Sequence, residues 1–388
     1  MTLLPTELPP LPAPLPVTSP VPLFASRPVI TACGLAVSGV ADERDLLGGP
    51  LGITREDPSA SGPGLRHKDR ASRMALRAVR RALDAAAIDA PAATAVVVSS
   101  NFGNLDTVCD FTDTIAAETV TGLSPLRVPH MSSHVTAAWV AIEHGLRGPN
   151  LTLCSGTPGG LDAVFWAAAL LAAGRAEVAV VVGVEPDTAP VARLHRERGG
   201  TAWLDGAVCL VVENAAHAAS RGARVRAAVS GYGKATDRAE AVRQALKAYD
   251  RPIGLRVAAG RDRPGPGARA GVGPSPQDGP VLDLTGRLGR CSGALGVLQC
   301  AAALAWFDRP AWEVERSRGP VADSVLAIAG AGRDVSAEAG PGSGVRPGTG
   351  SGTRAGGAAG ADGEGDPSGV SALLLTRPAP DGSGRVPS

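Results

Sequence analysis

The chain has 388 residues, enough for two modest domains or one large fold of two halves. Hydrophobic residues make up 44% of it but aromatic residues only 3%, so its core must consist mainly of Ala, Val and Leu. The formal net charge of +1 supplies no field to attract nucleic acid or an anionic membrane surface, and no basic run is interleaved with aromatic residues. Composition therefore argues against nucleic-acid and membrane-surface partners.

The cysteines and the N-terminal residues indicate the compartment. The six cysteines are scattered without a CxxC pair, and five lie in the apolar or small-residue surroundings typical of buried, reduced thiols. Residues 1–28 lack a basic n-region and are interrupted by prolines, unlike a signal peptide or a membrane-spanning helix. We expect a reduced, cytoplasmic protein.

In chain order, a disordered, proline-rich leader (1–27) precedes the folded part. Apolar runs of strand length then alternate with segments of helical period. Strands are predicted at 28–40, 95–99, 151–154, 178–184, 207–213 and 225–231, and helices at 69–87, 132–144 and 161–173. The run at 178–184 is the most hydrophobic, which predicts a strand buried on both faces within a parallel central sheet.

The pattern weakens in the second half of the chain. Helices are predicted at 239–249 and 293–307, strands at 281–284, 325–329 and 370–376, and a Gly-, Pro- and Arg-rich loop at 261–279. Residues 330–369 are of low complexity and cannot bury enough apolar surface to become ordered. Alternating strands and helices predict a layered α/β fold. Its predicted parts are the leader, an N-terminal half at 28–235, a C-terminal half at 236–377 that contains the 330–369 insert, and a disordered tail at 378–388.

The segment from Gly148 to Ala163, GPNLTLCSGTPGGLDA, is the most specific one in the chain. It resembles the active-site strand and elbow of the β-ketoacyl synthases, in which a Thr-Ala-Cys turn opens a buried helix. There the helix N-terminus and tight backbone lower the pKa of the nucleophilic thiol and offer hydrogen bonds to an oxyanion. Ungapped counting puts Thr157 at the position of that cysteine. Cys154 falls inside the predicted strand, and we interpret it as a small core residue rather than a displaced nucleophile.

Further segments extend the resemblance over about residues 28–235. They are Val180–Glu185, which resembles the family's next strand with its acidic end, then Asp205–Glu213 with Ala219–Ala223, and Val229–Gly233. The resemblance implies a thiolase-like α-β-α-β-α fold made of two similar halves.

A β-ketoacyl synthase also needs two histidines in its second half, which promote decarboxylation of a malonyl thioester and stabilise the enolate. The best match to the first places Ala259 at its position. The best match to the second places Thr285 at the family's lysine and Arg290 at the histidine, and no histidine follows His217. We therefore predict no catalytic residues, with Thr157, Ala259 and Arg290 at the degenerate positions. The 330–369 segment also falls where the family has its Gly-Phe-Gly-Gly active-site loop.

Without the thiol and the histidines, condensation would lose nearly every catalytic contribution, and a threonine hydroxyl with no base is a poor nucleophile.

Chain-length factors of type II polyketide synthases resemble ketosynthases, lack the cysteine, and form heterodimers with an active ketosynthase. The resemblance thus implies a non-catalytic subunit that pairs with an active ketosynthase and works with an acyl carrier protein bearing a phosphopantetheine-bound acyl chain. Chain-length factors commonly have glutamine where this chain has Thr157. Two alternatives stay open: a synthase with residual or unconventional acyltransferase activity, and a decayed paralogue without function.

The segment from Leu126 to Val135 corresponds to the part of the family that forms the dimer interface. His130 and His134 lie four residues apart within it, but no third ligand has suitable spacing, so we expect an interface or core role for them.

Ser155 lacks the GxSxG pattern of a nucleophile elbow, and the late glycines lack GxGxxG spacing. We expect no metal and no cofactor. Arg290 could form a salt bridge with a phosphopantetheine or with an acidic carrier-protein surface, but an ordinary solvated or paired arginine is the better interpretation.

Overall fold

The computed structural model of the chain describes residues 28–48, 57, 59, 62, 64, 65, 67–88, 93–196, 202–258, 279–309, 323–330 and 369–378. The predicted leader lies outside these residues, as do residues 261–278 of the predicted loop, 331–368 of the low-complexity segment and 379–388 of the predicted tail. Within the described ranges, no helix is both long and apolar enough to cross a membrane.

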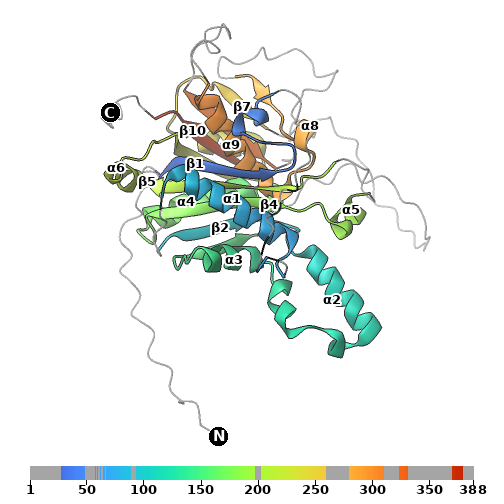
Figure 1. Cartoon of the computed structure of the whole chain (residues 1–388). Coiled ribbons are helices and arrows are strands. Elements are labelled where there is room, and N and C mark those ends of the chain that lie inside the picture. The colour runs from blue at the N-terminus through green and yellow to red at the C-terminus, as the bar shows by residue number, and fades with distance from the viewer. Residues whose placement is uncertain are drawn as a thin grey trace, which may run out of the picture.

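The described strands form one hydrogen-bonded sheet, in the order β3-β2-β4-β5-β1-β6-β10-β9-β7-β8 (Figure 1). Their bounds are β1 Pro28–Val37, β2 Ala95–Ser99, β3 Asn150–Leu153, β4 Val178–Glu185, β5 Gly206–Asn214, β6 Ala227–Ala235, β7 Leu255–Val257, β8 Val281–Leu282, β9 Ser324–Ala329 and β10 Val370–Thr376. The second five strands repeat the order of the first five in reverse. Each half has three parallel strands, then an antiparallel strand, then a central strand. The two similar halves are therefore confirmed.

Only a short contact joins the two halves of the sheet, because β1 pairs with β6 through Val29 and Ile30 alone. The expected parallel sheet is correct for β2, β3 and β4 but wrong for β5, which runs antiparallel to both β4 and β1. Continuous hydrophobicity reports burial on both faces of a strand, and burial does not determine strand direction.

The helices make the other layers. Their bounds are α1 Arg70–Ala86, α2 Leu105–Glu118, α3 Val135–Glu143, α4 Gly159–Ala172, α5 Ala189–Arg196, α6 Ala215–Ser220, α7 Arg238–Ala245, α8 Thr285–Leu288 and α9 Leu295–Phe307. One apolar cluster lies between α1 and α3 and the first half-sheet, and another lies between α7 and the second. The largest cluster surrounds α4 and α9, which contact strands of both halves. The layers α1/α3, half-sheet, α4/α9, half-sheet and α7 confirm the predicted α-β-α-β-α fold.

Capping residues and apolar stripes explain which helices could be predicted from the sequence. In α1, the Asp69 carboxylate caps the helix by accepting a hydrogen bond from Ser72 N at 2.7 Å, and Ala87 ends it in the left-handed conformation. An apolar stripe faces the sheet while arginines face solvent. Helices α2, α5, α6 and α8 and strand β7 were not predicted. On α2 only Thr107 and Phe111 are buried, so the helix has almost no apolar stripe to detect.

The two central helices cross at glycines. A Cβ on Gly160 would lie 2.7 Å from Gly296 N, and a Cβ on Gly296 would lie 2.2 Å from Leu161 N. Both distances are far below van der Waals contact, so α4 and α9 approach backbone to backbone. Both helices are apolar on nearly all sides, as expected for a layer covered by two sheets.

This crossing predicts that Gly296→Ala destabilises the fold by roughly 1–3 kcal/mol, the usual cost of overpacking a close contact. Chemical denaturation would measure it. Gly286→Ala is the matched control, because a Cβ there would meet nothing closer than Asp283 Oδ2 at 3.6 Å. Equal stability of the two variants would contradict the crossing.

Candidate functional site

The elbow, defined as residues 154–158, connects β3 to α4. Gly156 has φ +71°, a conformation that favours glycine, and Pro158 is the N-cap of α4. Gly159 has no room for a side chain, because a Cβ there would lie 2.7 Å from Ser99 Oγ. Thr157 is half-buried at the top of this tight turn, two residues before the helix. The local geometry resembles the elbow expected from the sequence.

Cys154 is not the core residue that we expected. It follows the last residue of β3 and its side chain is exposed. Desolvation by neighbouring atoms raises the pKa of the Cys154 thiol. A hydrogen bond with Ser133 acts to lower this pKa and the negative charge of Glu185 acts to raise it, so the pKa stays raised. A raised pKa leaves less thiolate at neutral pH. The structure thus exposes Cys154 without activating it.

Of the three second-half positions, only Arg290 lies on the loop directly before α9. Arg290 is exposed, and its backbone pairs with the segment before β5: its N–H donates to Ala202 O at 2.8 Å, and its carbonyl accepts from Leu204 N at 3.0 Å. Thr285 begins α8, where its backbone N–H and hydroxyl both donate to Asp283 Oδ1. Ala259 lies outside the described residues, two positions after the end of β7.

Asn101, which follows β2, holds the elbow and the loop before α9 together. Its Nδ2 donates to Ser292 Oγ at 2.7 Å, and its Oδ1 accepts from Gly156 N at 3.1 Å. Ser292 has φ +43°, an unusual conformation for a residue other than glycine. The 290–294 loop, which includes the 3₁₀ helix Ser292–Ala294, is therefore joined to the elbow through Ser292 and Asn101.

Glu185, the last residue of β4, lies beneath this contact and is fully buried. Its Oε1 accepts hydrogen bonds from Asn101 N at 2.8 Å and Gly293 N at 3.0 Å, and its Oε2 accepts one from Phe102 N at 3.1 Å. Burial raises the pKa of Glu185 to about 7, although these hydrogen bonds act to lower it. The sequence pattern places the acidic Glu185 at the end of this strand but indicates no role for it.

A second buried acid, Asp162, lies in the first turn of α4. It accepts hydrogen bonds from Tyr232 Oη at 2.8 Å, Ser371 Oγ at 2.5 Å and Lys234 Nζ at 2.5 Å, and a longer one from Ser155 Oγ at 3.3 Å. The cluster ties the elbow to β6 and β10. It provides a paired charge at the helix N-terminus rather than a free base.

The chemistry available to Thr157 is limited. Within the described part of the chain, no hydrogen bond reaches its hydroxyl. A threonine needs an adjacent base to become a nucleophile. The described arrangement is therefore a positioned turn without an activated nucleophile.

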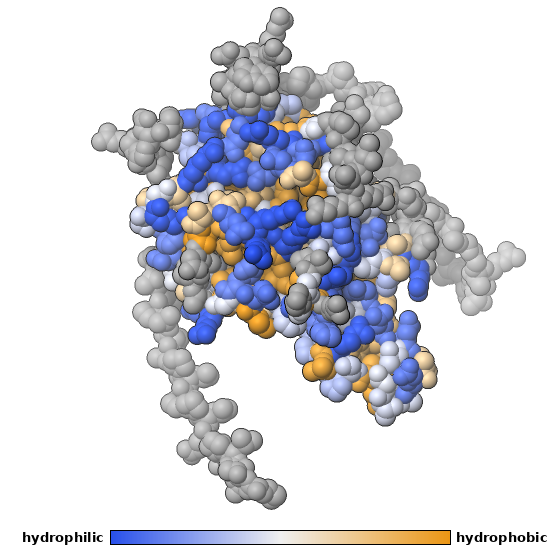
Figure 2. Space-filling view, viewed as in Figure 1, coloured by the Kyte–Doolittle hydropathy of each residue, from blue (hydrophilic) through white to orange (hydrophobic). Residues whose placement is uncertain are grey.

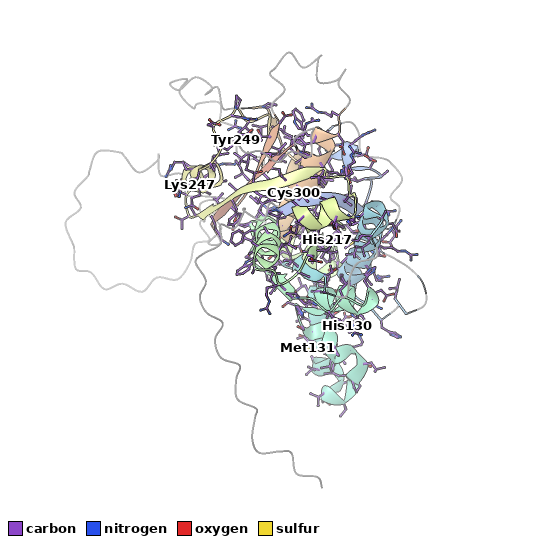
Figure 3. The ribbon with its side chains drawn as sticks, turned by 90° about the vertical axis from the view of Figure 1, so that its left-hand side faces the viewer. His130, Met131, His217, Lys247, Tyr249 and Cys300 are labelled. Atoms are coloured by element: carbon purple, nitrogen blue, oxygen red, sulfur yellow. The ribbon has the colours of Figure 1, made fainter. Side chains whose placement is uncertain are left out.

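His130 and His134 have other partners. His130 is buried at the base of α2, where its Nδ1 lies 3.8 Å from Asp69 Oδ2 and its ring centroid 5.6 Å from that of Trp139 (Figure 3). His134 Nδ1 lies 2.8 Å from Thr152 Oγ1 on β3. No group of three His, Cys, Asp or Glu residues that could hold a metal ion occurs among the described residues.

The elbow predicts that an acyl thioester probe does not label this chain at neutral pH, because the pKa of Cys154 is raised and no described residue serves Thr157 as a base. Mass spectrometry of the treated protein would measure labelling. Cys154→Ser should behave like the unmodified chain, and so should the control Cys109→Ser, which removes a half-buried thiol on α2. Labelling that only Cys154→Ser abolishes would identify Cys154 as a nucleophile.

Comparison with known proteins supports the expected family. The family model for the N-terminal domain of β-ketoacyl synthases matches residues 44–222. The 3-oxoacyl-[acyl-carrier-protein] synthase 2 of Rhizobium meliloti (strain 1021) is 29% identical over 37% of this chain, and the chain matches only 40% of that relative's length.

Two solved structures share the fold. One is described as the ishigamide ketosynthase/chain length factor, with a TM-score of 0.62, 20% identity, and coverage of 90% of this chain and 99% of that one. The other is AntDE:AntF, a type II polyketide synthase acyl-carrier protein in complex with its ketosynthase bound to the hexaketide. It has a TM-score of 0.58, 15% identity, and coverage of 91% and 99%. The chain thus has a two-half fold like that of known ketosynthases, and its residues 44–222 match the N-terminal domain of the β-ketoacyl synthases.

Proposed function

We propose that this chain is a non-catalytic subunit that pairs with an active β-ketoacyl-ACP synthase in polyketide or fatty-acid-type chain elongation. The observation that carries the proposal is the elbow, which has a tight turn and a helix but no base beside Thr157 among the described residues. Thr157 is the residue that the sequence resemblance aligns with the family's nucleophile. Arg290, exposed in the 290–294 loop, adds to the support for the proposal, because a guanidinium cannot act as the neutral hydrogen-bonding partner that a histidine provides.

The edge of the sheet at β3 offers a surface for a partner. β3 ends the strand order, and no described strand pairs with its outer side, so its outward backbone groups are free to bind another strand. Large apolar side chains are exposed in the helical layers above and below: Ile142 on α3 is 67% exposed, and Trp166 on α4 is 47% exposed. A helix as apolar as α4 normally lies buried on every side. This edge therefore suits a protein partner.

An arm formed by residues 105–131 extends this surface. It consists of α2 and two 3₁₀ helices, Val120–Gly122 and Pro125–Met131, and it projects away from the body (Figure 1). Apolar residues lie among polar ones on it (Figure 2). Its exposed large apolar side chains are Ile115, Val120, Leu126, Val128 and Met131. A projecting arm with so much exposed apolar surface favours burial against another subunit.

The occupant that we propose for this edge is the corresponding edge of a cysteine-bearing β-ketoacyl synthase. Strand addition would satisfy the free backbone groups of β3, and two such folds would present matching layers of helix, strand and helix. The acyl carrier protein with its phosphopantetheine-bound chain is the second proposed partner. Support comes from the AntDE:AntF complex, in which a carrier protein is bound to its ketosynthase.

The two alternatives have less support. Residual or unconventional acyltransferase activity would need an activated Thr157 or Cys154, and the described contacts activate neither. A decayed paralogue should accumulate charged residues in the core, yet β2 is fully buried and contains no charge, and β4 has only Glu185, which is fully hydrogen-bonded.

Co-expression with an active β-ketoacyl synthase is expected to yield a stable heterodimer in size-exclusion chromatography. Ile142→Asp and Trp166→Asp should weaken it, because each places a charge in the proposed interface. Val281→Asp is the matched control, since Val281 is 51% exposed on β8 at the opposite edge of the sheet. A clean monomer that the partner leaves unchanged would overturn the proposal.

Thr157→Ala is expected to change product formation by the complex less than about twofold, because the hydroxyl has no chemical task. The measurement is the rate of acyl-chain elongation with a carrier protein. Alanine in place of the partner's nucleophilic cysteine should abolish the same rate, which confirms that the assay reports condensation. A loss of about a hundredfold or more for Thr157→Ala would show that the hydroxyl takes part in catalysis.

A further inference from the structure

The arm of residues 105–131 is held together by its own contacts, although it projects from the body (Figure 1). At its base, Asn104 Nδ2 donates to Met131 O at 2.8 Å, so the segment that enters the arm is tied to the one that leaves it. Further out, Arg127 Nη2 pairs with Asp110 Oδ2 at 3.1 Å, and its guanidinium lies 5.7 Å from the ring centroid of the buried Phe111. These contacts join α2 to the 3₁₀ helix Pro125–Met131, so the arm presents a preformed surface.

Apolar side chains on this surface remain exposed in the described structure. Leu126, at 84%, and Val120, at 68%, are the most exposed of the large hydrophobic side chains that the structure describes. Ile115, Val128 and Met131 lie on the same arm with exposures between 41% and 52%. Such a concentration of exposed apolar side chains on one segment is typical of a protein interaction surface.

The arm is also acidic. Its acidic residues are Asp106, Asp110, Asp113 and Glu118. Arg127 is its only basic residue, so the arm carries a net charge of −3 with His130 neutral, while the whole chain carries +1. Arg127 neutralises Asp110, but Asp113 and Glu118 are exposed and pair with no described arginine or lysine. Helix α5 packs against α2, yet its described residues provide no ion pair to the arm. Two unpaired carboxylates therefore lie on the same helix as the exposed Ile115.

We propose that the arm docks on a basic and apolar face of the active β-ketoacyl synthase. Lysine or arginine side chains of the partner would meet the carboxylates of Asp113 and Glu118, and apolar side chains would cover Leu126 and Val120. Burial of apolar area provides affinity, while opposite charges speed association and select the partner. A carboxylate removed from water without a cation is costly, so a partner that covers the arm must supply the positive charge. This inference rests on the proposed pairing and states which kind of surface receives the arm.

The charge of the arm also distinguishes between the two proposed partners. A carrier protein with an acidic surface would be repelled by the arm, because like charges that meet across an interface cost free energy. Contact between the arms of two copies of this chain is disfavoured for the same reason. We therefore expect the synthase to cover the arm and the carrier protein to bind elsewhere on the complex.

Charge reversal in the full heterodimer tests the inference, with the same cysteine-bearing synthase as in the co-expression and with surface plasmon resonance as the measurement. The double variant Asp113→Lys with Glu118→Lys should raise the Kd about tenfold or more at about 0.05 M salt, mainly through slower association. At about 1 M salt the effect should nearly vanish, because salt screens exposed charges. Asp84→Lys with Asp250→Lys is the matched control, since it changes the net charge equally at exposed acids outside the arm. Its Kd should stay within about twofold of that of the unmodified chain.

Leu126→Ala separates the apolar contribution from the charge. It should raise the Kd by a similar factor at both salt concentrations, because salt does not screen apolar burial. If the heterodimer forms and the two double variants have the same Kd, this inference is wrong while the pairing stands. If the unmodified chain forms no heterodimer, the pairing is wrong and the inference with it. Binding of the carrier protein that Leu126→Ala abolishes would assign the arm to the carrier protein and also overturn the inference.

Discussion

The backbone contact between Gly160 and Gly296 is the constraint on which the rest of the structure depends. It brings α4 and α9 together without side chains between them and lets each contact strands of both half-sheets. The elbow ends directly before α4 and the 290–294 loop directly before α9. Because both turns precede helices that cross near these ends, the crossing also determines how close the turns lie.

Polar bonds then hold the site in place. Asn101 bridges the two turns, and Glu185 anchors Asn101, Phe102 and Gly293 from below. Glu185 and Glu213 lie near the ends of neighbouring strands, but their pKa values shift in opposite directions. Burial acts to raise the pKa of both, but hydrogen bonds from Arg221, Thr31 and His217 outweigh it at Glu213 and lower the pKa there. Ion pairing thus determines the direction of the pKa shift at Glu213, and burial determines it at Glu185.

Among the described residues, the elbow thus has its turn and helix but no activated nucleophile, and most of the exposed large apolar side chains lie on the β3 edge and the arm. These features fit together in the proposed subunit. A partner-binding fold needs its layers and turns to be rigid, because they support the edge that the partner meets. It has no need of a thiolate or a base, which is consistent with Thr157 in the turn.

The sequence by itself determined the layered α/β fold, most strands and the longer buried helices, because apolar runs and helical period report burial directly. It also located the elbow, since a glycine-rich turn between an apolar strand and an apolar helix is a local pattern. Only the tertiary structure decided the direction of β5, the exposure of Cys154 and the arm containing α2, because each depends on which segments pair or cover one another. The same is true of Glu185: its partners lie about 84 and 108 positions away in the chain, and only folding brings those amides to one carboxylate.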